Sequence, residues 1–241
     1  PRRDLKSKLD TLDTFCATEG MEGYQFSLAG ATMVAMPTGA LWWGAQKLLC
    51  VSDLHLGKSE RMARRGGAML PPYETTDTIL RVEADLRATG ASTIVCLGDS
   101  FDDLEAERGL PENEKLWLTR LQAGRRWIWI HGNHDPGPVE IAGSYLAELP
   151  LPPVVFRHEA KTGVSGEISG HYHPKARLNL RGSSYVKPAF LIDIDRVIMP
   201  AYGTYTGGLH AHTAPLCDLM RPDAIAVLTG SKALAIPMPR V

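Results

Sequence analysis

Leu48-Leu49-Cys50-Val51 is an apolar run that leads almost directly into Asp53-Leu54-His55. The same arrangement returns three times, because short apolar runs also precede Gly98-Asp99-Ser100-Phe101-Asp102, Gly132-Asn133-His134-Asp135 and Gly170-His171-Tyr172-His173. Such runs are typical of buried strands, and functional loops characteristically follow the ends of these strands. We therefore expect the four motifs to meet at the carboxyl ends of neighbouring strands.

The side chains of these motifs are carboxylates, an amide and imidazoles, with no thiolate among them. This ligand set disfavours a structural zinc or iron–sulfur site and suits an open hydrolytic site for Mn²⁺, Zn²⁺ or Fe²⁺. The ligands are too many for one ion. Two ions ~3.5–4 Å apart would share a bridging carboxylate and a bridging hydroxide that attacks phosphorus. A general acid would then protonate the leaving oxygen.

The composition is that of an ordinary globular protein. The chain has 241 residues, of which 44% are hydrophobic and 22% charged, and its net charge of −1 excludes a globally basic nucleic-acid binder but not a local basic patch. The four cysteines lack metal-ligand spacing, which is typical of free thiols in a reducing compartment. No apolar run approaches the ~20 residues of a membrane span. We expect a soluble, cytoplasmic protein without a membrane partner.

The periodicity divides the chain into two parts. Leu5, Leu9, Leu12 and Cys16 share one face of a predicted helix, so residues 1–22 are interpreted as a helical extension and residues 23–241 as a single domain. The strand–motif–helix repetition of the first half predicts parallel neighbouring strands, and the second half is mainly β. We expect an α/β (α+β-like) fold: a two-sheet β-sandwich flanked by helices, with a dimetal site at strand ends.

Several elements can be placed more closely. The pattern predicts an extended segment over residues 24–37, a helix over 74–89 that ends at Gly90, and a helix over 111–121. Leu116, Trp117 and Leu121 are the apolar residues of that last helix, and Trp42 and Trp43 are expected in the core.

The order of the four motifs resembles that of the calcineurin-like metallophosphoesterases. The resemblance implies seven metal ligands: Asp53, His55 and His173 for the first ion, Asn133, His158 and His171 for the second, and Asp99 between them. His158 is the isolated histidine that the family places between its third and fourth motifs. His134 would contact the phosphate or protonate the leaving group, and Asp102 would orient His134.

A narrower resemblance comes from the surroundings of these motifs. Asp-Leu-His-Leu-Gly-Lys at 53–58, Gly-Glu-Ile-Ser-Gly-His-Tyr-His-Pro at 166–174 and Pro-Ala-Tyr-Gly-Thr-Tyr at 200–205 are similar to the bacterial ligase-associated DNA damage response endonucleases. This implies an Mn²⁺-dependent endonuclease or phosphodiesterase in DNA repair, with DNA as substrate. The implied partners are a DNA ligase, a helicase and an exonuclease of the same repair system.

Three classes of function remain open at this stage. A DNA nuclease competes with a small-molecule phosphodiesterase or phosphatase and with a non-catalytic metal-binding scaffold. The scaffold is disfavoured because every ligand position is filled. A polyanion needs cations along several phosphates. Candidate DNA-binding residues follow the first and fourth motifs: Lys58, Arg61, Arg65 and Lys175, with Tyr172 as a base-stacking side chain.

Overall fold

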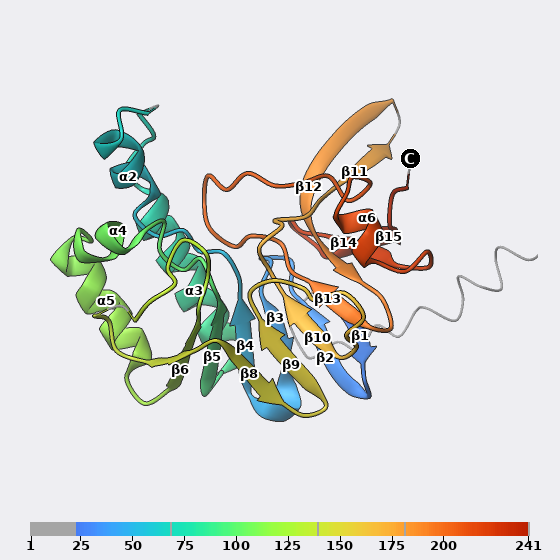
Figure 1. Cartoon of the computed structure of the whole chain (residues 1–241), viewed down its shortest axis with the longest axis horizontal. Helices are drawn as coiled ribbons and strands as arrows, with labels where there is room; N and C mark the ends of the chain where they lie inside the picture. The colour runs from blue at the N-terminus through green and yellow to red at the C-terminus, as the bar shows by residue number, and fades with distance from the viewer. Residues whose placement is uncertain (1–22, 68, 139, 181, 241) are drawn as a thin grey trace, which may run out of the picture.

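The strands of this protein pair into two sheets that pack face to face. The structure, a computed structural model, describes residues 23–67, 69–138, 140–180 and 182–240, so the helix predicted within residues 1–22 lies outside the described residues. Helices cover the outer side of one sheet (Figure 1). The predicted α/β two-sheet sandwich flanked by helices is confirmed.

The first sheet carries three of the four motifs. Its strands lie in chain order: β1 (Tyr24–Leu28), β2 (Ala31–Ala35), β3 (Leu41–Trp43), β4 (Leu48–Val51), β5 (Thr93–Leu97), β6 (Arg126–Ile130) and β7 (Ser144–Leu146). The pairs from β1 to β4 are antiparallel and those from β4 to β7 are parallel. The single extended segment predicted over residues 24–37 is wrong, because a turn at Ala29 and Gly30, both with positive φ, divides it into a hairpin.

The second sheet carries the fourth motif and most of the later chain. Its order is β15 (Leu234–Pro237), β14 (Ile225–Leu228), β12 (Ser183–Ile192), β13 (Arg196–Ile198), β10 (Glu167–Ser169), β9 (Val154–Arg157) and β8 (Glu148–Leu151). Strand β11 (Lys175–Leu180) pairs only with β12. Residues 175–188 of these two strands form a hairpin that rises away from the sheet (Figure 1), which we call the hairpin arm.

The helices lie mainly beside the first sheet. They are α2 (Lys58–Arg64), α3 (Glu74–Thr89), α4 (Leu104–Arg108), α5 (Glu112–Gln122) and α6 (Leu216–Leu219), with one 3₁₀ turn, η1 (Gly44–Gln46). Helix α3 has the predicted limits and ends at Gly90 in the left-handed conformation. Helix α5 lies within one residue of its prediction. Its Leu116 is exposed, however, and Leu118 and Leu121 supply its buried face.

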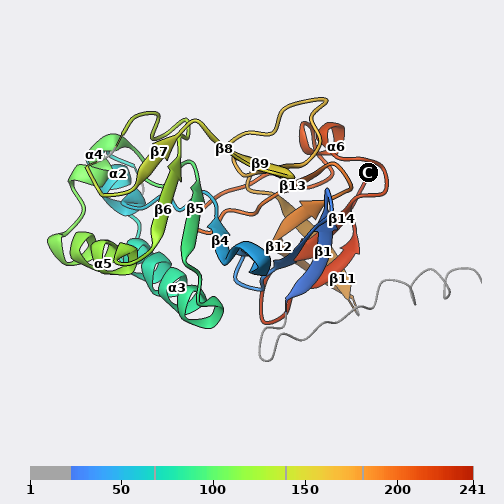
Figure 2. The same cartoon turned by 90° about the horizontal axis from the view of Figure 1, so that it is seen from below.

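Alternation along the central strands explains how two cores form. In β4, Leu48 and Cys50 pack between the sheets, whereas Leu49 and Val51 pack against the helices. Helices α3 and α5 cover that second face (Figure 2). The inner core combines strands of both sheets, with Phe156 and Phe190 from the second sheet fully buried. Trp42 and Trp43 are buried as expected. Within the described residues, no helix is long and apolar enough to cross a membrane.

Candidate metal centre

The first two motifs lie side by side because the pairing of β4 and β5 continues past both strands. The amide of Asp53 donates to the Gly98 carbonyl at 3.3 Å, and that of His55 donates to the Asp99 carbonyl at 2.9 Å. Since β6 is the next parallel neighbour, the third motif emerges at the same edge. The sequence prediction that the strand ends gather the motifs is therefore confirmed for these three strands.

The backbone at this edge adopts unusual conformations. Five of the candidate ligands have a positive φ angle, namely Asp53, His55, Asp99, His171 and His173. Residues other than glycine rarely adopt this region, and such conformations persist where the surrounding structure enforces them, typically at functional sites. The strain is concentrated here: five of the eight positive-φ residues other than glycine in the described chain are candidate ligands.

The glycine at the head of each of the later motifs allows close approach. A Cβ atom on Gly98 would collide with the imidazole of His158, and one on Gly132 with the amide and carboxylate of Asp99. A Cβ on Gly170 would collide with the Ser52 hydroxyl. Glycine is required because neighbouring motifs press directly against these backbones.

The first cluster contains Asp53, His55 and His173. The Nε2 atom of His173 lies 3.1 Å from the Asp53 carboxylate and 3.4 Å from Nε2 of His55. Nδ1 of His55 binds the carboxylate of Asp102 at 2.8 Å, so Nε2 is directed into the cluster. A carboxylate that orients a histidine in this way is characteristic of metal sites.

The second cluster contains Asp99, Asn133, His158 and His171. Oδ1 of Asn133 lies 2.9 Å from Nε2 of His158 and 3.0 Å from Nδ1 of His171, and the two imidazole nitrogens are 3.1 Å apart. The carboxylate of Asp99 lies 3.4 Å from Nε2 of His158. The isolated histidine thus joins the same group as the motif residues. Asp99 groups with this cluster, and its bridging role stays a prediction.

The donor atoms fit divalent cations. Ligands ~2.1 Å from a common ion stand roughly 3.0–3.4 Å from one another, and the donor atoms of the two clusters are 2.9–3.4 Å apart. Nδ1 of His158 donates to the Leu97 carbonyl at 2.8 Å, so its Nε2 presents a lone pair to the Asn133 oxygen and the Asp99 carboxylate unless it is protonated. Atoms of this kind repel one another without a positive charge between them.

The pKa shifts of His158 and Asp99 also show that this cluster favours positive charge. Burial opposes the charged imidazole, but the hydrogen bond with Asp99 and the charges of Asp53 and Asp99 raise the pKa of His158 to about 9. Burial also favours protonation of Asp99, yet its bond to His158 holds the Asp99 pKa well below the usual range. Two divalent ions would satisfy these carboxylates directly.

Two groups of Asp102 contact the centre. Its carboxylate contacts His55 at 2.8 Å and the Arg61 guanidinium at 2.8 Å. Its main-chain carbonyl, and not its carboxylate, meets Nδ1 of His134 at 2.8 Å, so the predicted contact between Asp102 and His134 is made by the backbone. Since a carbonyl only accepts, Nδ1 carries a proton and Nε2 is the atom that can exchange one. The spacing of the motifs could not show which group of Asp102 contacts His134, because a contact made by the backbone leaves no signal in the sequence.

Asp135 is a site residue to which the sequence reasoning assigned no role. Its buried carboxylate accepts hydrogen bonds from the amides of Gly132, Asp99 and Ser100 at 2.8–3.0 Å. Burial is the main cause that raises the pKa of Asp135 to about 6, against these hydrogen bonds. The residue ties the second motif to the third. Its position as the last residue of Gly132-Asn133-His134-Asp135 is the sequence feature that could have identified it as a site residue.

The candidate substrate residues differ in their surroundings. Arg61 is engaged with Asp102, Lys58 lies 3.5 Å from the same carboxylate, and Arg65 reaches Asp103 at 3.4 Å. The Tyr172 hydroxyl donates to Glu159 at 3.1 Å, and the Tyr172 ring packs edge-on against His171. Lys175 begins β11, directly beyond His173 and Pro174. All five lie beside the metal centre or on the elements that leave it.

This centre, at the strand ends of a two-sheet sandwich, defines a class of protein. Residues 46–188 match the family model described as calcineurin-like phosphoesterase, a span that contains all four motifs. The chain belongs to this family and is a metallophosphoesterase, a class of phosphoester hydrolase that uses dimetal sites.

Two solved structures are similar to this chain. The crystal structure of Pseudomonas putida nuclease MPE matches with a TM-score of 0.69 and 24% identity, covering 89% of this chain and 100% of that one. Yfce, a phosphoesterase from E. coli, matches with a TM-score of 0.38 and 11% identity, over 80% of this chain and 99% of that one. The first likeness supports the fold, and the second is too weak to carry an argument. No curated protein sequence matches the chain.

Proposed function

We propose that this metallophosphoesterase is a metal-dependent nuclease that hydrolyses phosphodiester bonds of DNA in repair. The observation that favours DNA as the substrate is the positive charge of the hairpin arm. The arm, residues 175–188, contains four cations and no carboxylate, and Lys175, at the start of the arm, lies two residues beyond His173 of the first cluster. A single phosphate ester needs one or two cations, whereas a polymer needs cations along its backbone.

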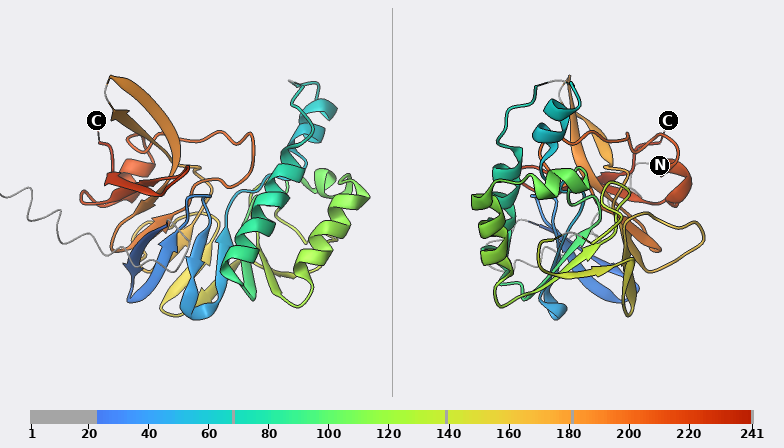
Figure 3. Two further views of the ribbon diagram at one scale, coloured as in Figure 1. Left: turned by 180° about the vertical axis from the view of Figure 1, so that it is seen from behind. Right: turned by 60° about the vertical axis from the view of Figure 1, so that its left-hand side comes forward.

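The position of the arm favours a long substrate. Helix α2 and the hairpin arm project in the same direction, and the strand ends lie between them (Figures 1 and 3). Arg177 and Lys187 are exposed on the arm, and the neighbouring Tyr185 is half exposed. A substrate that is bound along the arm and continues toward α2 has to cross the metal centre. A nucleic-acid strand meets this requirement, and a small phosphoester does not.

A loop at the rim of the first cluster supplies aromatic surface. The amide of Gly203 donates to the Asp53 carbonyl at 3.1 Å, and the hydroxyl of Thr204 binds Asp77 of α3. In the same loop, the ring of Tyr205 lies 5.7 Å from that of Tyr73, which is 54% exposed. Bases stack on aromatic rings of this kind. We propose this pair as a stacking surface for a base beside the cleaved phosphate.

The residues of the centre have separate parts in the proposed reaction. Divalent ions, with Mn²⁺ as our choice for this mixed oxygen and nitrogen ligand set, would supply Lewis-acid activation of water and neutralise phosphoryl charge. Nε2 of His134 is free to contact the phosphate or to deliver a proton to the leaving oxygen, because Nδ1 is fixed on the Asp102 carbonyl. Asp102 keeps His55 directed into the first cluster.

The test compares substrates and metals in one assay. Metal-free protein is reconstituted with Mn²⁺, Zn²⁺, Mg²⁺ or Ca²⁺ and offered single-stranded, duplex and nicked DNA together with aryl phosphate mono- and diesters. Asn133→Ala and Asp99→Ala give the background, because each removes a proposed ligand. DNA cleavage that both variants lose supports the proposal. Hydrolysis of the aryl esters alone would favour a small-molecule phosphodiesterase instead.

Two further observations support the proposal without deciding it. The similar Pseudomonas putida protein is named a nuclease. The narrower sequence resemblance to ligase-associated endonucleases supports a role in DNA repair. A physical association with a ligase, helicase or exonuclease is part of the proposal, and co-purification of the tagged chain with these proteins would test it.

A further inference from the structure

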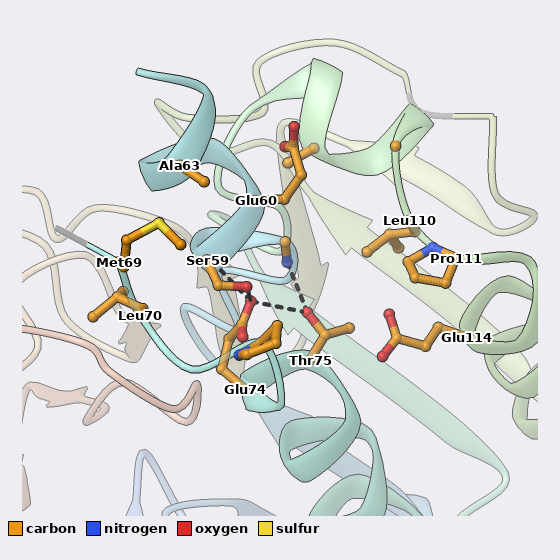
Figure 4. A pocket seen from close by; sticks show the side chains of 14 residues that line it. Ser59, Glu60, Ala63, Met69, Leu70, Glu74, Thr75, Leu110, Pro111 and Glu114 are labelled. Atoms are coloured by element: carbon orange, nitrogen blue, oxygen red, sulfur yellow. Dashed lines mark hydrogen bonds between the residues drawn. The ribbon is translucent and has the colours of Figure 1, made fainter. Parts of the chain in front are cut away.

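A cavity lies below helix α2, away from the metal ligands. It has a volume of about 310 Å³ and is enclosed by α2, the chain that leads into α3, and the start of α5 (Figure 4). Most of its wall is apolar: Ala63, Leu70, Pro72, Ala106, Leu110 and Pro111. This volume is within the range of small-ligand sites, whose walls are mostly apolar with a few fixed polar groups.

Two buried carboxylates supply the polar part of the wall. Glu74, the first residue of α3, is 2% exposed, and Glu114 of α5 is 6% exposed. They enter the cavity from opposite sides, whereas the carboxylate of Glu60 turns away (Figure 4). One oxygen of Glu74 accepts hydrogen bonds from the amide and hydroxyl of Ser59 at 2.9 and 2.8 Å. The other oxygen is buried and has no partner among the described residues.

We infer that this cavity binds an organic ammonium ion with an alkyl body. A buried carboxylate oxygen without a donor is costly, and an ammonium group supplies both a donor and the opposite charge. Glu114 offers a second acceptor, since the one hydrogen bond given for its carboxylate among the described residues comes from the Thr76 hydroxyl at 2.6 Å. The apolar wall favours a hydrocarbon chain over the water that could otherwise reach these carboxylates.

This site is separate from the proposed nuclease reaction but is attached to the same helix. None of the residues that line the cavity is a proposed metal ligand. Ser59 faces the cavity from α2, and Arg61 of the same helix holds Asp102 beside His55. The inference goes beyond the proposed function and does not depend on it, because binding is measured without substrate or metal.

The probe is n-hexylammonium, titrated into the metal-free full chain and followed by amide chemical shifts in NMR. We expect saturable shifts at Ser59, Thr75 and Leu110. 1-Hexanol has the same body without the charge, and hexanoate has the opposite charge. Since a hydrogen bond to a charged group is worth roughly tenfold or more in affinity, we expect hexanol to bind about tenfold more weakly and hexanoate not to bind.

Two variants and a matched control locate the binding. Glu114→Gln keeps the shape of the wall and removes its charge, and we expect hexylammonium to bind it about tenfold more weakly. Ala63→Leu fills the cavity from α2 and should abolish the shifts. Glu112→Gln, an exposed change on the same helix as Glu114, should leave binding unchanged. Equal affinity for hexanol, full binding by Glu114→Gln, or the absence of saturable shifts would each overturn the inference. In the last case the cavity holds only water.

Discussion

The two basic regions that flank the metal centre have similar numbers of cations, but they differ in how these cations are paired with acids. Helix α2 and the residue after it carry Lys58, Arg61, Arg64 and Arg65. Their partners are the carboxylates of Asp102, Asp103, Glu60 and Glu105, so the cations of this region are matched by acids. The hairpin arm has a comparable number of cations and no acidic residue. Within the described residues, no ion pair joins a cation of the arm to an acid, so of these two regions we expect the arm to attract a polyanion.

The difference shows that the number of cations near a site does not measure its affinity for phosphate. Arg61 donates a hydrogen bond to Asp102, and Asp102 directs His55 into the first cluster. This arginine therefore supports the metal centre. Arg177 on the arm contacts only the neutral Ser184 hydroxyl among the bonds described for it. We therefore expect changes in α2 to alter catalysis on every substrate and changes in the arm to alter DNA binding alone.

The largest effect is expected at His134, whose ring packs edge-on against His55 in the metal centre. His134→Ala should lower DNA cleavage about 10²- to 10⁴-fold, because a general acid contributes this much. Metal content, measured by atomic absorption, should be unchanged. A nitrophenyl diester, whose leaving group needs little protonation, should lose less activity. Full activity of the variant on DNA would show that His134 has no part in the reaction.

Arg61→Ala tests whether α2 serves the metal centre. We expect hydrolysis of both DNA and an aryl phosphodiester to fall about tenfold to a hundredfold, the usual cost of losing a partner behind a metal ligand. Steady-state rates at saturating Mn²⁺ and at limiting Mn²⁺ measure the change. Arg64→Ala is the matched control, since Arg64 pairs with Asp103 rather than Asp102. If Arg61→Ala lowered only the hydrolysis of DNA, the result would indicate that α2 contacts the substrate.

The double change Arg177→Ala and Lys187→Ala tests the hairpin arm. Two lost phosphate contacts should weaken DNA binding about tenfold near 0.1 M salt and lower the slope of log affinity against log salt by roughly 1.5. Hydrolysis of the aryl diester should not change. Arg87→Ala with Arg120→Ala removes two cations from the outer helices and should leave binding as it was. An unchanged salt slope in the arm variant would contradict the proposed DNA path.

The smallest effect is expected at the aromatic pair. Tyr205→Ala should weaken DNA cleavage about fivefold, because loss of one stacked base costs upwards of ~1 kcal/mol. Tyr205→Phe keeps the ring and should behave as the natural protein. DNA with an abasic residue beside the cleaved phosphate makes the comparison sharper, since it has no base to stack. If the abasic substrate still distinguishes Tyr205→Ala from the natural protein, the loss has another cause.

Much of the fold followed from periodicity. Alternation and apolar runs predicted β4, β5 and β6, and the limits of α3 were given by its apolar stripe and Gly90. The hairpin turn at Gly30 was missed because the flanking residues look continuously extended. Leu116 was misplaced because the apolar residues of α5 do not mark one face clearly, and the buried side falls on Leu118 and Leu121.

The sequence by itself determined the metallophosphoesterase fold class and identified the candidate donor groups of the centre. These follow from residue type and motif order, because only certain side chains bind divalent metals and strand ends place them together. The tertiary structure decided which groups face each other. It set the Asp102 carboxylate against His55 and Arg61 and the Asp102 carbonyl against His134, and it paired the cations of α2 with acids. Such pairings depend on distances across the chain, which local sequence does not encode.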